Sequence, residues 1–426
     1  MHSLRAAIDW FARSPARAFV FIFLVAFSIR AIALTRVPVS WVTPSGGGQE
    51  DKIAVSLLER GEYSSTYKVP TGPTAHVPPL YPFLISLIYR LVGLTLTAGY
   101  VRWLVDIAIV SAAYAMLPWL AARLGLSPHG GLLAGIAGAL HVQWFCTVEF
   151  LAMIFLALLL VGFLRRWTRD RSSTAGSLAI GVAFGAALHL KPALLPVFLG
   201  CAVFELWWSR DRRMWLHSAV VVLGVILACV PWAWRNWNVF HSVFFIRSNF
   251  GLELRVGNHQ GAASDVSQSY RQGTLLHPEA HIEEAILVRE LGEIEYMRKA
   301  RGEAFEWMRA HPTKYLSLSV RRFAGFWFGS WYRPLTATGI TLLTILAALG
   351  AWKIIPALSI PQRAALIIPL LTFPVVYYLV SYEPRYRIPI AWILLLFAGT
   401  AVWELVRWPE KDRRSSSVDT NPPAIT

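Results

Sequence analysis

The stretch 148–164, VEFLAMIFLALLLVGFL, contains one charged side chain, Glu149, and is otherwise apolar. At 1.5 Å per residue, a helix of this length is roughly 25 Å long. The hydrocarbon core of a bilayer is about 30 Å thick and takes about 17 to 25 apolar residues to cross. We therefore expect this stretch to form a transmembrane helix.

Similar apolar stretches recur along the whole chain. Hydrophobic residues make up 55% of the sequence and charged residues 15%, whereas a soluble domain has about 25% charged residues. This composition excludes a soluble globular domain. The predicted fold is an all-α polytopic membrane protein with about ten transmembrane helices. Besides the first, the expected spans lie near 18–35, 100–122, 130–146, 175–189, 192–208, 215–234, 335–353, 363–381 and 387–406.

The short loops between these stretches are rich in basic residues. The chain has 40 Lys and Arg against 25 Asp and Glu, a formal net charge of +15. Short basic loops stay on the cytoplasmic side of a membrane, which places both termini there. Because the charge lies in loops rather than on one folded surface, we expect no nucleic-acid partner. The loops are defined by Arg165, Arg166, Arg169, Arg171, Arg210, Arg212, Arg213, Arg407, Lys411, Arg413 and Arg414.

Two long polar segments, 35–79 and 236–313, interrupt the series of spans, and this topology places both on the external face. Loops of this length are usually functional or disordered, and their aromatic and apolar residues argue against disorder. We expect them to form a small mixed cap outside the membrane. Within them the sequence predicts a polar turn that leads into a short helix over 46–61, an amphipathic segment over 78–93 and a helix over 278–310.

These expectations divide the chain into six regions. The first span is expected to remain uncleaved, because Arg30 interrupts its apolar run. The regions are a cytoplasmic N-terminus with the first span (1–35), the first external loop (36–99), a helix bundle (100–235), the second external loop (236–316), the C-terminal spans (317–408) and a disordered cytoplasmic tail (409–426).

Two adjacent acids, Glu50 and Asp51, lie in the first external loop close to Gly46, Gly47 and Gly48. Glycine lets a backbone bend closely around a ligand, and a carboxylate at the membrane surface can serve as a general base. The alternative is that the acids only cap the N-terminus of a helix, where the helix dipole favours them. The spacing alone leaves both interpretations open.

Basic side chains recur at the outer ends of later spans. Lys191 follows His189, Arg235 ends another span, and Arg385 and Arg387 lie in the segment EPRYRIP. Charges this close to hydrocarbon are costly unless they are paired. Guanidinium and ammonium groups at this level suit a lipid-borne phosphate, although each could also only extend its head group to the interface.

Two further features leave alternatives open. Glu149 is either near the outer surface or an intramembrane acid that needs a partner. His277 and His281 are spaced i, i+4 ahead of Glu284, which suggests a metal site, but Pro278 between the histidines favours a helix start instead. We expect no metal ligands and no resident cofactor, with a divalent metal left open.

Several motifs together resemble a known family of membrane enzymes. The chain is similar to bacterial polyprenyl-phosphate-sugar-dependent glycosyltransferases of the C-type superfold, the group with protein O-mannosyltransferases and the lipid A aminoarabinose transferase. The resemblance covers most of the chain. Its matching motifs are EDKIAVSLLERG (50–61), PTGPTAHVPPLYP (70–82), SNFGLELRVGN (248–258), GEIEYM (292–297) and EPRYRIP (383–389).

The resemblance implies an inverting transfer of a sugar from polyprenyl (undecaprenyl) phosphate to an acceptor glycan, lipid or protein, on the outer face of the bacterial cytoplasmic membrane. An acid of the first external loop would deprotonate the acceptor, and here that role falls to Glu50 or Asp51, with Glu50 favoured. Membrane lipids would surround the chain. The donor phosphate is expected at Lys191, Arg235, Arg385 and Arg387, and the substrate pocket at His76, Tyr81, Glu149, His189 and Asn258.

Two other classes of function also fit a polytopic chain. A transporter or a flippase for lipid-linked sugars would have a similar number of spans, but its polar residues usually lie at the midplane in a pattern repeated between two halves. Here the charges lie near the ends of spans and no half-to-half symmetry is seen. A scaffold without activity that binds a partner through its external loops is the third alternative.

Overall fold

The computed structural model describes residues 2–142, 146–168, 173–209 and 212–418. Within them the chain is helical, with no strand and with two isolated bridges, Ser64 to Pro73 and Asp265 to Tyr382. The α-helices are α1 His2–Ala12, α2 Pro15–Leu34, α3 Val39–Val42, α4 Gln49–Arg60, α5 Leu80–Val92, α6 Leu96–Ala115, α7 Leu117–Arg123, α8 Pro128–Leu140, α9 Thr147–Thr168, α10 Thr174–Leu188, α11 Leu195–Trp208, α12 Arg212–Phe240, α13 Phe250–Gly257, α14 Val266–Arg271, α15 Ile282–Leu291, α16 Glu293–Ala310, α17 Pro312–Phe328, α18 Pro334–Ile354, α19 Ile360–Thr372, α20 Val375–Leu379 and α21 Ile388–Val418. Short 3₁₀ turns occupy Pro44–Gly46, Pro192–Leu194, Ile355–Ala357 and Pro384–Arg387.

The predicted class, an all-α polytopic membrane protein, is confirmed. By length and composition, seven helical segments of the described chain can cross a membrane: Pro15–Leu34, Leu96–Arg123, Thr147–Thr168, Arg212–Phe240, Pro334–Ala357, Ile360–Leu379 and Pro384–Val406. The spans expected near 130–146, 175–189 and 192–208 are shorter helices, α8, α10 and α11. Residues 143–145, in the first of these, lie outside the described residues.

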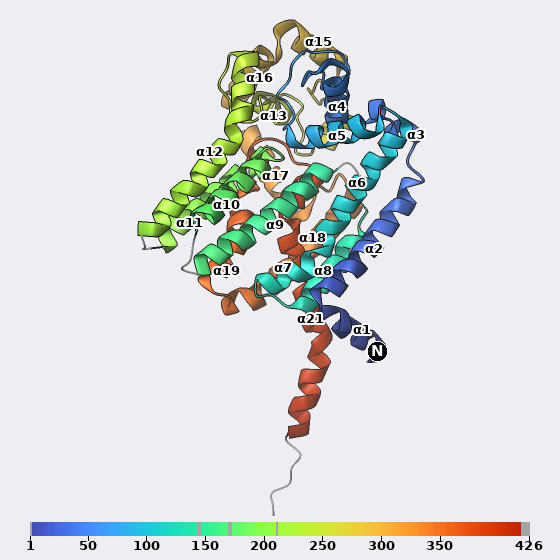
Figure 1. The fold of residues 1–426 in the computed structure, drawn as a ribbon, viewed down its shortest axis with the longest axis vertical. Coiled ribbons are helices and arrows are strands. Elements are labelled where there is room, and N and C mark those ends of the chain that lie inside the picture. The colour runs from blue at the N-terminus through green and yellow to red at the C-terminus, as the bar shows by residue number, and fades with distance from the viewer. Residues whose placement is uncertain (1, 143–145, 169–172, 210–211, 419–426) are drawn as a thin grey trace, which may run out of the picture.

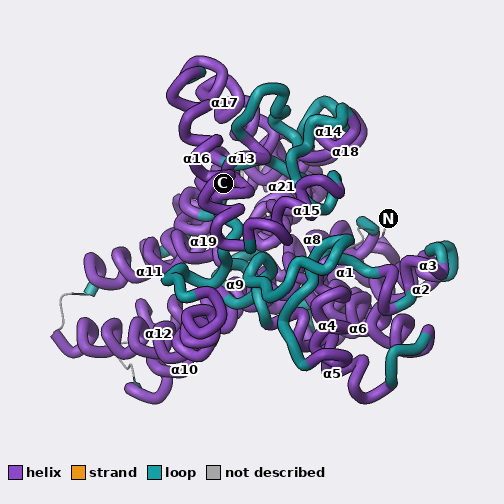
Figure 2. Tube along the Cα trace, turned by 90° about the horizontal axis from the view of Figure 1, so that it is seen from above, coloured by secondary structure: helices purple, strands orange, loops and turns teal. Residues whose placement is uncertain are grey.

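The spanning helices form a bundle with the polar segments gathered at one end (Figure 1). The helices α4, α5, α13, α15 and α16 lie above the bundle, and α1 and the end of α21 lie below it. Viewed from above, α10, α11 and α12 project to one side of the molecule (Figure 2). The two segments that the sequence placed on one face therefore form a single cap.

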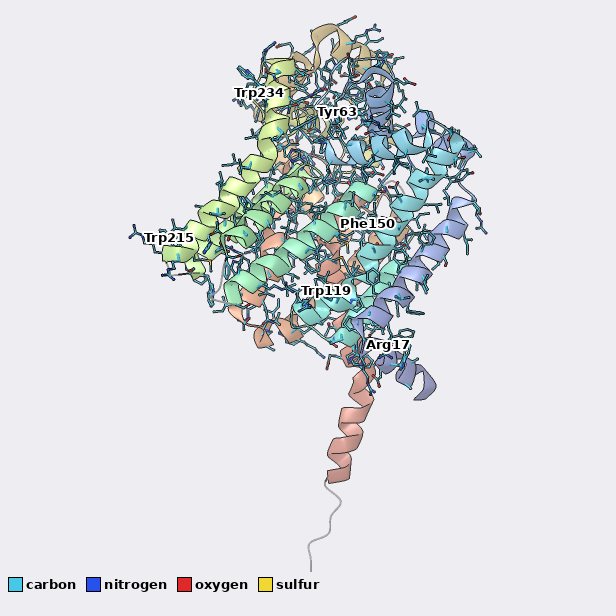
Figure 3. All side chains as sticks on the ribbon, viewed as in Figure 1. Arg17, Tyr63, Trp119, Phe150, Trp215 and Trp234 are labelled. Atoms are coloured by element: carbon cyan, nitrogen blue, oxygen red, sulfur yellow. The ribbon has the colours of Figure 1, made fainter. Side chains whose placement is uncertain are left out.

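Aromatic side chains mark both ends of the bundle (Figure 3). Trp234 lies near the cap and Trp215 at the far end of the same helix, with exposed fractions of 67% and 56%. Amphipathic rings of this kind prefer the two interfaces of a bilayer. The length of α12 between these rings agrees with a membrane crossing.

The cap consists of helices joined by irregular loops. The short helix expected over 46–61 is confirmed as α4, which ends at Gly61 with a φ of +68°, and the amphipathic segment over 78–93 is α5. The single helix expected over 278–310 is wrong. Gly292 adopts a φ of +75° and separates α15 from α16, because this left-handed conformation cannot continue a helix.

One carboxylate connects the two polar segments. Glu293 accepts hydrogen bonds from the backbone N–H of Ala75 at 2.7 Å and from the hydroxyls of Thr74 and Ser248. Arg235 adds a second connection, donating to the carbonyls of Tyr63 and Thr74 at 3.0 and 2.9 Å. The first polar segment is thereby fixed to the second and to the end of α12.

The far end of the bundle has a buried ion pair of its own. Arg166 on α9 donates through two nitrogens to Glu205 on α11, at 3.0 and 2.7 Å. The final helix, α21, continues to Val418, so the tail expected to be disordered from residue 409 is helical as far as that residue. Residues 419–426 of the expected tail lie outside the described residues.

Candidate functional site

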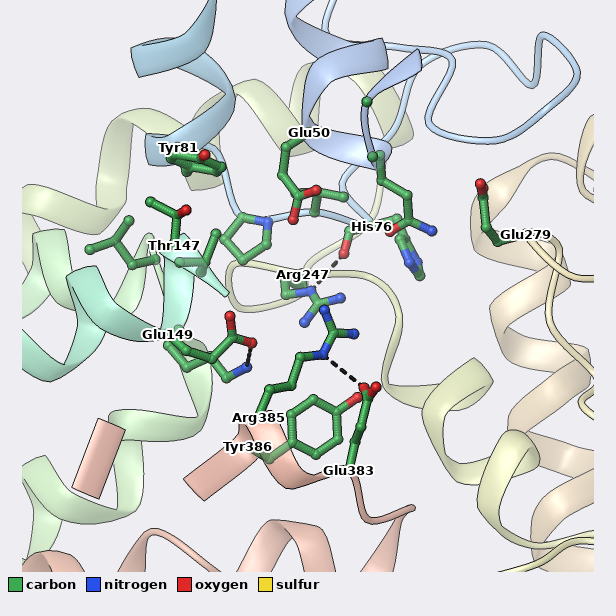
Figure 4. Close-up of a pocket in the computed structure, with 18 of the residues that line it drawn as sticks. Glu50, His76, Tyr81, Thr147, Glu149, Arg247, Glu279, Glu383, Arg385 and Tyr386 are labelled. Carbon is green, nitrogen blue, oxygen red and sulfur yellow. Dashed lines mark hydrogen bonds and ion pairs between the residues drawn. The ribbon is translucent and has the colours of Figure 1, made fainter. Parts of the chain in front are cut away.

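A cavity of about 500 Å³ lies where the cap meets the ends of the spans. Three parts of the chain contribute its walls, which Figure 4 shows from within. The first polar segment and α5 contribute Trp41, Gly46, Gly47, Gly48, Gln49, Glu50, His76, Val77, Pro78 and Tyr81; the ends of spans contribute Arg102, Thr147, Val148, Glu149, Leu190, Lys191, Glu383, Arg385 and Tyr386; the second polar segment contributes Arg247, Glu253, Val256, Val266, Leu275, His277 and Glu279.

Glu50 points into this cavity from the first turn of α4 (Figure 4). Gly47 permits the tight approach of the preceding loop, because a Cβ there would lie 2.2 Å from the Asp51 carboxyl carbon. Among the described side chains, none forms a hydrogen bond or ion pair with the Glu50 carboxylate. Burial raises the pKa of Glu50, and the nearby charge of Asp51 raises it further.

Asp51 faces away from the cavity and is buried, with an exposed fraction of 1%. Its carboxylate accepts hydrogen bonds from Tyr89 Oη at 2.6 Å, Arg102 Nη2 at 2.9 Å and the Gly48 backbone N–H at 3.1 Å. These donors fix the start of α4 against α5 and α6. Asp51 does not line the cavity.

Two of the four predicted phosphate ligands line the cavity. Lys191 Nζ donates to Glu149 Oε1 at 3.0 Å and lies 4.9 Å from the centre of the Tyr386 ring. Arg385 donates through Nε to Glu383 Oε2 at 2.7 Å, which leaves both terminal nitrogens without a hydrogen-bond partner among the described residues. Each carboxylate therefore orients a cation while leaving donors directed at the cavity.

The other two predicted ligands, Arg235 and Arg387, do not line the cavity. Arg235 donates to backbone carbonyls of the first polar segment. Arg387 has an exposed fraction of 4% and donates to Thr344 Oγ1 at 3.2 Å, between α21 and α18. Arg235 and Arg387 therefore lie apart from the other two predicted ligands, and their guanidinium groups donate to other parts of the fold instead.

Among the five residues expected in the substrate pocket, His76, Tyr81 and Glu149 line the cavity. His189 and Asn258 do not. The ring of His189 interacts with the Gly185 carbonyl at 2.7 Å, and Asn258 is fully buried with Arg322 donating to its side-chain oxygen. Both therefore have structural partners away from the cavity.

Sequence reasoning missed several lining residues, of which Arg247 is the most significant. Its Nε donates to the His76 carbonyl at 2.6 Å, and its guanidinium enters the cavity from the cap while that of Arg385 enters from the bundle (Figure 4). Arg102, His277 and Glu279 were also missed as lining residues. The one available signal was that Arg247 directly precedes the motif SNFGLELRVGN.

The suspected metal ligands do not come together. Glu284 accepts hydrogen bonds from Arg255 and Tyr296, and His281 begins α15 away from the cavity that His277 lines. Within the described ranges, no group of three or more His, Cys, Asp or Glu side chains has the arrangement of a metal site.

Comparison with known proteins gave matches among solved structures and none at the level of sequence. No protein family model matches the chain, and no curated protein matches it. Among solved structures, the chain is similar to the crystal structure of ArnT from Cupriavidus metallidurans bound to undecaprenyl phosphate. The identity is 14%, the TM-score is 0.35, and the alignment covers 92% of this chain and 78% of that one. The cavity itself is therefore the basis for a function.

Proposed function

We propose that this chain is an inverting membrane glycosyltransferase. It takes a sugar from a polyprenyl phosphate and transfers it to an acceptor hydroxyl or amine on a glycan, lipid or protein at the outer face of a bacterial cytoplasmic membrane. The observation that carries the proposal is the juxtaposition, in one cavity at the end of the spans, of an acid without a side-chain partner, Glu50, and two guanidinium groups, Arg247 and Arg385.

Glu50 has the properties of a general base. An inverting transfer needs one carboxylate, which accepts the proton of the attacking group as the new bond to the anomeric carbon forms. A base is most effective when its pKa approaches the working pH, and burial raises the pKa of Glu50 in that direction. Asp51, held by three donors, serves to position α4 rather than to accept a proton.

Arg385, Arg247 and Lys191 suit the leaving phosphate. A polyprenyl tail stays in hydrocarbon, so its phosphate must be bound at the membrane boundary, where the cavity lies. As the bond between the anomeric carbon and the phosphate oxygen breaks, the electron pair remains on that oxygen. Directed N–H donors stabilise the charge that develops there. The leaving group is the polyprenyl phosphate itself.

The position of the charges favours an enzyme over a transporter. A transporter holds its substrate near the bilayer midplane between two related halves, whereas this cavity is covered by the cap at one end of the bundle. The cap segments also enclose the reacting groups, which limits access of water as a competing acceptor.

The test is a transfer assay with purified protein in lipid nanodiscs. Labelled polyprenyl-phosphate sugars are supplied with a cell-envelope acceptor fraction, and release of polyprenyl phosphate is measured. We expect Glu50→Gln to lose 100-fold or more of the rate, on the order of a general-base contribution. The matched control Glu59→Gln, an exposed acid on the same helix, should keep it. Equal rates for wild type and Glu50→Gln, or no release by wild type from any donor, would overturn the proposal.

A further inference from the structure

Opposite the bundle-side cations, the cap wall of the cavity carries polar atoms that the fold leaves unused. His76 has an exposed fraction of 2%, and its Nδ1 is buried with no hydrogen-bond partner in the described part of the chain. Glu279 Oε2 is likewise buried without a hydrogen-bond partner among the described residues. A buried polar atom without a partner costs free energy, so such atoms beside a cavity point to a bound ligand that satisfies them.

His277 completes this group of side chains. The centres of the His76 and His277 rings are 5.7 Å apart, and both rings lie within about 6 Å of Tyr67. His277 Nδ1 accepts the backbone N–H of Glu279 at 3.0 Å, so in the neutral ring the proton resides on Nε2. The group therefore offers a donor on His277, an acceptor on Glu279 and, on His76, a ring nitrogen that donates or accepts according to its tautomer.

This part of the wall carries no net charge. Burial, together with the charges of Arg247 and Arg255, lowers the pKa of His277 to about 4, and burial lowers the pKa of His76 well below its ordinary value. Both rings are therefore neutral near pH 7. The Glu279 carboxylate is balanced by Lys52, whose Nζ donates to Oε1 at 2.8 Å. A ligand with hydroxyls satisfies this surface, and none of these three side chains offers a charged sugar substituent a free counter-charge.

The same wall is connected to the cation that enters from the cap. The backbone carbonyl of His76 accepts from Arg247 Nε at 2.6 Å, so the imidazole and the guanidinium are held together. Figure 4 shows Glu50, Arg247 and His76 around one part of the cavity. A sugar joined to a phosphate at Arg247 lies within reach of the His76 ring.

From this arrangement we propose that His76, His277 and Glu279 form a sugar subsite, and that the donor's sugar is an uncharged, hydroxyl-bearing sugar rather than an amino sugar or a uronic acid. The inference rests on the proposed function, since it takes the phosphate to bind at Arg247 and Arg385. It adds the class of the donor sugar and the side chains that select it.

The test compares the binding of three kinds of lipid to the protein in nanodiscs: undecaprenyl phosphate, the same lipid bearing a neutral hexose, and the same lipid bearing an aminohexose or a hexuronic acid. We expect the hexose to tighten binding about tenfold over the bare phosphate and the charged sugars to add nothing. His76→Phe and His277→Gln should each remove most of the hexose gain while leaving the affinity for bare undecaprenyl phosphate within about twofold. His281→Asn, outside the cavity, is the control.

The outcomes separate the two proposals. If bare undecaprenyl phosphate fails to bind to wild type, the proposed function falls. If the bare lipid binds but the hexose gives no gain, or a charged sugar binds tighter, the subsite is wrong while the proposed function stands. If His76→Phe alone fails to fold, judged by loss of bare-lipid binding, His277→Gln decides: an unchanged hexose gain in that variant overturns the subsite.

Discussion

Glu50 and Asp51 are consecutive residues in the first turn of α4, yet their carboxylates lie in two different environments. Asp51 is buried among three donors, and Glu50 faces the cavity without a side-chain partner in the described chain. Successive residues of a helix point about 100° apart, so one acid can anchor the helix while its neighbour faces the cavity. The two positions should therefore respond to substitution in opposite ways.

Replacing Glu50 by Gln should stabilise the protein while removing activity. Because burial raises the pKa of Glu50, the ionised form disfavours folding, and this cost is greatest at a pH above the raised value. Gln carries no charge, so we expect a higher thermal midpoint for Glu50→Gln than for wild type at pH 7.5. The difference should shrink as the pH falls through the pKa of Glu50. A lower midpoint at pH 7.5 would show instead that Glu50 is a structural residue.

Replacing Asp51 by Asn should have the opposite effect on stability. The substitution breaks a buried ion pair with Arg102 and puts an amide donor against the donors of Tyr89 and Gly48. Removing one partner of a buried pair costs about 3–5 kcal/mol. We expect a lower thermal midpoint for Asp51→Asn and a loss of activity that follows the loss of folded protein. Activity per folded molecule should fall less than in Glu50→Gln.

As the pH is lowered, the rate of transfer should begin to fall at a higher pH than it would with a glutamate of ordinary pKa as the base. Glu50 must be ionised to accept a proton, and burial raises its pKa. The positive charge of Arg385 lowers that pKa, so Arg385→Gln should move the acid limb of the kcat profile to still higher pH. The measurement is kcat between pH 4 and 9 for both proteins. An acid limb that stays in place in Arg385→Gln would contradict the proposed proximity of the two groups.

Arg385 and Arg387 offer a matched pair of arginines in one motif. Arg385 lines the cavity, and its terminal nitrogens have no hydrogen-bond partner in the described part of the chain, whereas Arg387 is buried against Thr344. A hydrogen bond to a charged group is worth about 1.5–3 kcal/mol, or roughly 10- to 100-fold in affinity. Arg385→Ala should weaken binding of undecaprenyl phosphate by that factor. Arg387→Ala should lower the thermal midpoint and leave the affinity of the remaining folded protein nearly unchanged.

Substituting Glu293 should loosen the cap. Its carboxylate accepts from Thr74, Ala75 and Ser248, and Glu293→Ala leaves these buried donors without a partner. An unsatisfied buried donor costs about 1–3 kcal/mol. We expect faster proteolysis within 62–79 and a lower affinity for undecaprenyl phosphate. Glu295→Ala, two residues along and exposed, is the control, and equal proteolysis of the two variants would contradict this role.

The fold could be predicted from composition, because the thickness of a bilayer sets the length of each apolar helix that crosses it. Hydropathy located every long span, and it also located α8, α10 and α11, which are shorter than the length expected of a helix that crosses a bilayer. Only α8 ends well before its expected bound, at Leu140 rather than near residue 146. Likewise, the conformation of Gly292 that breaks the predicted helix has no signal in hydropathy.

The site was only partly predictable, for a different reason. Glu50, Lys191 and Arg385 lie beside the ends of recognisable elements, so their convergence followed from topology. Arg235 also lies near the end of a span, yet its N–H groups donate to carbonyls of a distant loop. Arg247 and His277 lie in irregular chain, where no periodicity indicates the direction of a side chain.

The connection through Glu293 has a consequence for how the protein is made. Thr74 and Glu293 are 219 positions apart, and the cavity wall extends from Trp41 to Tyr386. Chains emerge from the ribosome N-terminal end first, so the acid of α4 is synthesised long before Arg385. A nascent chain can hold no lipid-linked sugar in reacting position until the segment with Arg385 and the final helix α21 have been inserted. The proposed chemistry is thereby withheld from every incomplete product of translation.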